Sequence, residues 1–138
     1  MTAAHNRKLR EMTVTIGGVS FENQLVTAEI QNNTDDGTVF HTFGGDDGSF
    51  VEAADDSYAL NLVMYSDWRS AGVSDWLWDN DGETVDFTLV HHPNTVGETV
   101  QWDGEVLIKA PTVGGEVRTT EQTSVVLQCP AKPTKSRP

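Results

Sequence analysis

The sequence predicts a mainly β fold, an antiparallel β-sandwich or half-barrel with one short α-helix packed on it. Three observations predict this class. Apolar and polar residues alternate in several short runs, which is the period of a half-buried strand. Gly, Asp, Asn and Pro separate these runs, as they do between strands of antiparallel sheets. One segment alone changes to helical spacing, so sheets supply most of the core.

The first strands follow from alternation in chain order. Met12, Val14 and Ile16 predict one strand, and the Gly pair at 17 and 18 turns the chain into a second run, residues 19–30. The ENQ segment at 22–24 interrupts that run, which predicts a bulge or a tight turn. Apolar residues occupy both faces of Tyr58–Tyr65, so we expect this strand to be central in its sheet.

Residues 66–81 change from strand to helical spacing. Val73, Trp76 and Leu77 fall at i, i+3 and i+4, which is one apolar stripe of a helix. We therefore expect a helix of two to three turns here, with Ser70 or Ser74 capping its start. Strands resume after it, at residues 84–90, 100–110 and 124–129.

The chain is expected to form one domain over residues 12–130. Residues 1–11 are polar and unpatterned and are predicted to be a flexible N-terminal segment. Residues 131–138 are a basic, Pro-rich tail in which we expect no regular structure. Residues 31–57 hold two Asp-Gly turns around the apolar VFHTF segment. So long an excursion is unusual unless it forms a small hairpin or serves a function.

Acidic residues dominate the chain between its two basic ends. The net charge is −12, and residues 11–131 hold all 21 acids against three basic residues, a net charge of −18. Nucleic-acid binding depends on Lys and Arg contacts to phosphates, so specific DNA recognition is excluded. Such a surface suits solubility, cation binding or a passage along which a polyanion slides without sticking.

The acids between the predicted helix and the next strand do not fit a calcium loop. With Gly82 at position 6 of an EF-hand, Leu77 would stand at position 1 and Thr88 at position 12, where oxygen ligands from carboxylates are needed. A strand follows where a second helix should. The segment is therefore interpreted as a helix-to-strand corner.

The sequence contains no motif for a zinc site, a catalytic nucleophile or a phosphate-binding loop. His91 and His92 are neighbours on a predicted strand and would point to opposite faces, and no CxxC or HExxH spacing is present. Nucleophile and phosphate-loop motifs are also missing from the sequence. We therefore expect no enzymatic activity, no metal site and no cofactor.

Cys129 is the one cysteine, so no disulfide can form within the chain, and we interpret it as a small buried residue at a strand end. No apolar run reaches the roughly 18 residues that a membrane span needs, and the first residues lack the apolar stretch of a signal peptide. The protein is expected to be cytoplasmic when made.

Four tryptophans remain. Trp76 and Trp102 fall at inward positions, whereas Trp68 and Trp78 fit no stripe and are interpreted as interface residues or as a platform for sugar. The predicted core comprises Trp76, Leu77, Val85, Phe87, Leu89, Trp102, Val106 and Ile108.

The second half of the chain resembles a known family. The segments AGVSDWLWDNDGETVDFTLVHHP (71–93) and VQWDGEVLIKAPTVGGEVRTTEQTSVVLQCP (100–130) are similar to the C-terminal half of major tail tube proteins of long-tailed, siphovirus-type bacteriophages, particularly those of actinobacterial hosts. The shared pattern is a short helix, a turn, an alternating strand, a further strand before GGEV, and a last strand that ends at Pro. It covers about 60 of the 138 residues.

The resemblance implies a structural subunit that forms hexameric rings stacked into a hollow tube. Its partners would be other copies of itself and the tape measure, tail-tip and tail terminator proteins. DNA would pass without specific binding, and the protein would lie in the virion tail after assembly in the host cytoplasm. The long excursion would reach a neighbouring ring.

The same resemblance assigns residues to two kinds of surface. Asp86, Asp103 and Glu105 are candidates for an acidic lining of the channel, which would repel phosphates from the wall. Candidates for contacts between rings or subunits are Arg7, Lys8, Arg10, Phe40, Phe43, Lys132, Lys135 and Arg137.

Two alternatives remain open. A tail terminator, or another ring protein that completes the head-tail junction, would share this fold. A β-sandwich that binds carbohydrate or calcium through Trp68, Trp78 and the Asp-Gly loops is the alternative from a different class.

Overall fold

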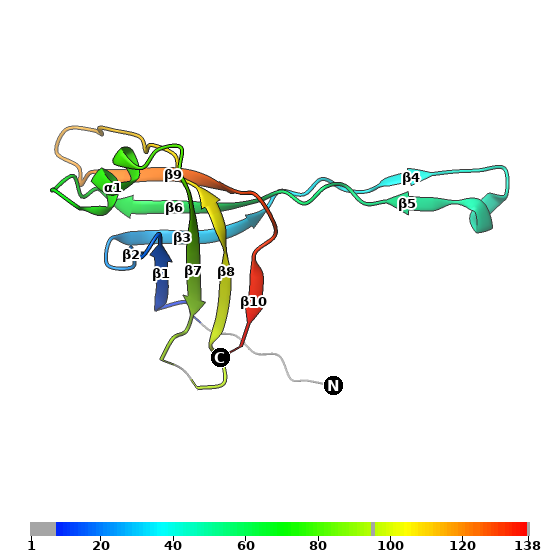
Figure 1. The fold of residues 1–138 in the computed structure, drawn as a ribbon, viewed down its shortest axis with the longest axis horizontal. Helices are drawn as coiled ribbons and strands as arrows, with labels where there is room; N and C mark the ends of the chain where they lie inside the picture. Colours follow the sequence, from blue (N-terminus) through cyan, green and yellow to red (C-terminus); the bar gives the residue numbers. More distant parts are fainter. Residues whose placement is uncertain (1–7, 95, 138) are drawn as a thin grey trace.

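Two antiparallel sheets form the body of the protein, which confirms the mainly β class predicted from the sequence. The structure is a computed structural model that describes residues 8–94 and 96–137. A five-stranded sheet has the order β10-β8-β7-β1-β2, and a three-stranded sheet has the order β3-β6-β9. Their strands run crosswise to each other (Figure 1), so the fold is β-sandwich-like with its core between the sheets.

The element bounds agree with most of the predicted runs. The five-stranded sheet contains β1 (Met12–Ile16), β2 (Val19–Ser20), β7 (Thr84–His91), β8 (Val100–Leu107) and β10 (Thr134–Ser136). The three-stranded sheet contains β3 (Leu25–Asn32), β6 (Tyr58–Tyr65) and β9 (Gln122–Cys129). No helix in the described part of the chain is long and apolar enough to cross a membrane.

The Gly pair joins β1 to β2 through a two-residue turn. Gly17 and Gly18 have φ values of 58° and 83°, and Ile16 pairs with Val19 across them. Two positive φ values in a two-residue hairpin explain why glycine occupies both positions. A Cβ at Gly17 would also lie 2.8 Å from the Trp76 ring. The turn therefore brings the first hairpin against the helix.

The interruption at 22–24 is a turn, followed by a bulge. The Gln24 N–H donates to the Phe21 carbonyl at 3.0 Å, and the register between β3 and β6 shifts between Leu25 and Thr27. Strand β6 is central in its sheet, as its two apolar faces predict. The buried core residues come from both sheets and the helix: Val14, Ile16, Phe21, Leu60, Leu62, Met64, Val73, Leu77, Phe87, Leu89, Val106, Ile108, Val125 and Leu127.

The helix α1 (Val73–Asp79) buries Val73 and Leu77, and Trp76 packs edge-on against Phe21 with ring centroids 5.9 Å apart. The predicted serine cap is wrong, because Gly72 occupies the N-cap position and no side chain caps the helix. Ser74 has another role. Its hydroxyl accepts the Asp67 N–H at 3.1 Å.

The expectation that the C-terminal tail forms no regular structure is wrong. Strand β10 pairs with the edge of β8, with Thr134 opposite Asp103 and Lys135 opposite Trp102. Pro133 lies just before the strand and is buried, so the paired residues keep their N–H groups. The prolines that predicted an irregular tail thus bracket a short strand, and the body extends past residue 130.

Residues 33–57 form a long hairpin, which we call the arm. It projects from the body as a continuation of β3 and β6 (Figure 1), and its two ends are joined where the Asn33 N–H donates to the Ser57 carbonyl at 2.7 Å. The arm contains β4 (Thr38–Phe40), a 3-10 turn (Gly45–Gly48) and β5 (Phe50–Glu52). The predicted excursion began two residues earlier, at residues that belong to β3.

Candidate functional site

The three acids predicted to line a channel lie together on the outer face of β7 and β8. Asp86 stands directly opposite Glu105, and Thr88 stands opposite Asp103. Both members of the first pair are exposed, and the described residues place no hydrogen bond or ion pair on either side chain. Like charges directly opposite each other disfavour strand pairing. The sheet therefore keeps an acidic strip at some cost to its own stability.

Asp103 is held more firmly than its two neighbours. Its carboxylate accepts the Thr88 hydroxyl at 2.8 Å and the Gln101 side-chain amide at 2.9 and 3.0 Å. These bonds fix the orientation of the carboxylate on the strip. Asp86 and Glu105 are the two acids there with free side chains, so they would present most of the strip's charge to a neighbouring polyanion.

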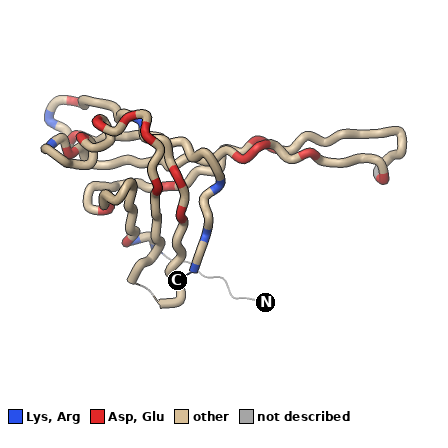
Figure 2. Tube along the Cα trace, in the orientation of Figure 1, with Lys and Arg blue, Asp and Glu red and all other residues tan. Residues whose placement is uncertain are grey.

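The basic candidates lie before β1 and around β10, the strands on either side of β7 and β8 in the sheet. Lys8 and Arg10 are exposed before β1, and Lys132, Lys135 and Arg137 are exposed around β10. Figure 2 shows the basic positions along β10 and the acidic positions on β7, β8 and the arm. Arg7 lies outside the described residues. The basic positions near the two chain ends thus flank the acidic positions of β7 and β8 in the five-stranded sheet.

The arm carries exposed aromatic side chains. The rings of Phe40 and Phe50 stack with centroids 5.1 Å apart and remain 39% and 56% exposed. Phe43 at the tip is fully exposed, and Val39 and Val51 beside the stacked pair are at least half exposed. The rest of the described chain covers none of these five side chains. The arm also holds seven acids and no Lys or Arg.

A groove of about 550 Å³ opens at the root of the arm. Its apolar walls come from both sheets, and the His91 ring packs edge-on against Trp102 with centroids 4.7 Å apart. Burial, and then the charge of His92, lower the pKa of His91 from its ordinary value. The lining residues are Leu9, Ala28, Glu29, Ile30, Tyr58, Leu89, His91, Trp102 and Lys132.

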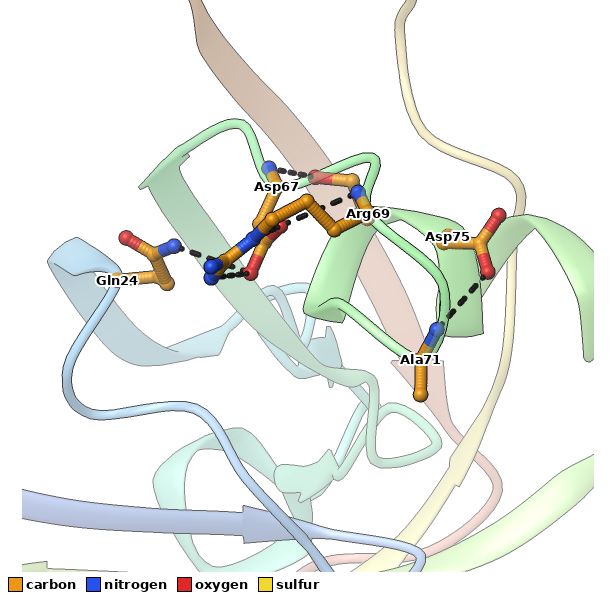
Figure 3. Close-up of polar contacts among 6 residues, drawn as sticks. Gln24, Asp67, Arg69, Ala71 and Asp75 are labelled. Atoms are coloured by element: carbon orange, nitrogen blue, oxygen red, sulfur yellow. Dashed lines mark hydrogen bonds and ion pairs between the residues drawn. The ribbon is translucent and has the colours of Figure 1, made fainter.

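A polar corner at Asp67 fixes the entrance to the helix, and sequence reasoning missed it (Figure 3). The Asp67 carboxylate accepts Arg69 Nε and Nη2, both at 2.9 Å, and Gln24 Nε2 at 3.3 Å. The hydrogen bond from Arg69 holds the pKa of this carboxyl well below its usual range. A Cβ at Gly72 would lie 2.5 Å from the Asp67 carbonyl, so the corner excludes larger residues there. The DWR order is its only sequence signal.

Trp68 and Trp78, which fit no predicted stripe, pair with each other. Their rings meet edge to face with centroids 6.2 Å apart, and Trp68 Nε1 donates to Glu121 Oε2 at 3.1 Å. Trp78 is 52% exposed. The pair lies partly on the surface, as either an interface or a sugar platform requires.

The acidic corner after the helix has a structural role. Asp81 Oδ1 accepts the Ala110 N–H at 2.8 Å, and the Gly82 N–H donates to the Ile108 carbonyl at the same distance. Within the described residues, no three His, Cys, Asp or Glu side chains come together as a metal site would require. Burial raises the pKa of the half-buried Cys129 thiol, which disfavours the reactive thiolate.

The predicted core residues lie where the sequence placed them. Leu77, Phe87, Leu89, Val106 and Ile108 are buried, while Trp76, Val85 and Trp102 pack against them and are partly buried. No family model matches the chain, and no curated protein matches it. The acidic strip, the arm and the exposed basic residues are the surface features that a function has to explain.

Proposed function

We propose that this protein is a structural subunit of a bacteriophage tail tube that assembles into stacked, hexameric rings. The arm carries the proposal. A monomer in water gains nothing from extending a hairpin whose Phe and Val side chains stay uncovered, because burial of such surface is the main favourable term in association. A neighbouring subunit that covers the arm accounts for these residues.

The edges of both sheets support assembly. Strands β2 and β10 end one sheet, and β3 and β9 end the other, so each sheet has edges with backbone groups open to further pairing. Native proteins cover or close such edges, and a ring of subunits closes them by pairing the strands of neighbours. The basic surface around β10 and the acidic arm add charge complementarity between copies.

The acidic strip supports a channel for DNA. Asp86 and Glu105, which have no ion-pair partner among the described residues, repel each other in the isolated chain. A channel lining that must repel phosphates would explain why two acids face each other there. Under this proposal the strip faces the lumen, DNA passes without being bound, and the tube meets the tape measure, tail-tip and terminator proteins at the virion tail. No catalytic step is proposed.

Electron microscopy of the purified protein over a range of concentration and salt tests the proposal. Stacked rings or tubes are the expected result. Single rings that never stack would favour a tail terminator instead. A persistent monomer would overturn the assembly proposal, and a melting temperature raised by calcium or a sugar would then favour a binding module built on the Trp68–Trp78 pair.

A further inference from the structure

We propose that the groove at the root of the arm is the receptor for the arm tip of a second copy of this chain. The inference rests on the self-assembly that the proposed function requires, and it adds the surface that receives the arm. It is carried by the groove's lining, by the charges around it, and by the direction in which the arm leaves the body.

The groove offers apolar walls to an aromatic ligand. Ile30 and Tyr58 line it from the arm's own root, and Leu89 and Trp102 line it from the other sheet. Its volume of about 550 Å³ lies within the range of about 300–1,000 Å³ that is typical of ligand sites. Stacked aromatic rings that enter such a pocket are the usual anchors of protein interfaces. The Phe40–Phe50 pair supplies them.

The charges around the groove complement those of the arm. Lys132 lines the groove, and Lys135 pairs with Trp102 across β10 and β8. Lys8 and Arg10 are the chain neighbours of Leu9, which also lines it. Glu29 is the one acid among the lining residues. Residues 38–52, the outer part of the arm, hold three acids and no Lys or Arg, so the arm tip and the basic residues around the groove attract each other before they touch.

The arm of the same copy is directed away from this groove. The hairpin continues the direction of β3 and β6, and its tip lies at the far end from the body (Figure 1). The occupant must therefore come from another copy. Since the arm and the groove are different surfaces, the contact is heterologous and repeats head to tail, which suits growth along an axis.

Two variants isolate the two halves of the contact. Phe40→Ser/Phe50→Ser removes the aromatic anchors of the arm, and Lys132→Glu/Lys135→Glu reverses the charge beside the groove. All four side chains are exposed, so each variant should fold, as circular dichroism would verify.

Each variant has a matched control elsewhere on the surface. Val113→Ser/Val117→Ser removes exposed apolar side chains from the loop before β9, and Lys109→Glu/Arg118→Glu makes the same charge change as the groove variant. These four residues are exposed and do not line the groove. The controls should associate as the wild type does.

Sedimentation velocity at low salt measures the association. Each of the two test variants alone should associate at least tenfold more weakly than the wild type. Mixed together, they should form a 1:1 complex that does not grow, because one partner keeps a working arm and the other keeps a working groove. Raised salt should weaken that complex, since the attraction is partly electrostatic.

Two results would overturn the inference: a groove variant that assembles like the wild type, or a mixture in which no complex forms while the wild type assembles. Failure of the proposed function looks different. A 1:1 complex from the mixture, with a wild type that never gives rings or tubes, would retain the docking contact and reject the tail tube. A groove variant that stacks rings into tubes as the wild type does would reject the docking contact and retain the tail tube, and a wild type that stays monomeric would reject both.

Discussion

The ring of Phe87 lies directly over Gly104, its register partner on the neighbouring strand. A Cβ at Gly104 would come within 2.9 Å of Phe87 Cε1 and 3.4 Å of the Pro133 Cα. Phe87 is buried in the core, and Pro133 leads into β10, so neither can move aside easily. The absence of a side chain at residue 104 thus lets the core ring and the C-terminal segment meet.

Replacing Gly104 should therefore destabilise the fold. We expect Gly104→Val to lower the free energy of unfolding by about 1–3 kcal/mol, the usual cost of overpacking a core. Urea denaturation followed by circular dichroism measures it. Gly115→Ala is the control, because its Cβ would meet only the Glu121 side chain at 4.0 Å, and a change within about 0.5 kcal/mol is expected. Equal stabilities for the two variants would contradict the packing described here.

The C-terminal segment should also contribute to stability. A chain that ends at Pro130 loses β10 and exposes the edge of β8, with each lost hydrogen bond costing about 0.5–1.5 kcal/mol. Its urea midpoint should fall below that of the full chain. Lys135→Ala/Arg137→Ala removes charge but keeps the strand, so that variant should keep the midpoint of the wild type. A truncated chain as stable as the full one would mean that β10 contributes no stability.

His91 should make stability depend on pH. Burial and the charge of His92 lower its pKa in the folded protein, so between the folded value and the ordinary value of 6.5 the unfolded chain binds more protons. Stability is then complete above about pH 7.5 and is lost as the pH falls below about 6.5. We expect His91→Gln to flatten this part of the profile of melting temperature against pH, while His41→Gln, in the exposed arm, should leave it unchanged. A slope that survives His91→Gln would assign the effect to another group.

Relieving the repulsion on the acidic strip should stabilise the isolated protein. Glu105→Lys places a positive charge opposite Asp86, which we expect to raise the free energy of unfolding by about 0.2–1 kcal/mol at low salt. The gain should shrink at high salt as the charges are screened. Glu83→Lys makes the same charge change away from the strip. If both variants gain equally, the effect is one of net charge and the cross-strand pair is not its cause.

Local spacing predicted the elements well where one period governs a run. Spacing alone was enough to predict the burial of Val14 and Ile16 on β1, and of Val73 and Leu77 on the helix. Strand β10 could not be found that way. The three residues of β10 carry no period, and they form a strand because the edge of β8, about 30 residues earlier in the chain, is open to pairing.

Some surface features could likewise be predicted from local spacing, and others could not. The acidic strip could be predicted, since Asp86 and Glu105 stand at outward positions of alternating strands, although their exact pairing needed the register. The groove could not be predicted, because its walls come from four strands and both ends of the described chain. The Asp67 corner was missed for a similar reason: Gln24, one of its donors, lies 43 residues away.

The arm is also a mechanical element. Its strand β4 is joined to β3 through residues 33–37, and β5 is joined through residues 53–57 to β6, the central strand of a three-stranded sheet. Because hydrogen bonds in antiparallel pairs lie perpendicular to the strands, a pull on the tip loads the β6–β9 ladder along its length, so that many bonds resist together. Tension that reaches the hairpin from outside is thereby delivered to the most extensively paired strand in the described protein.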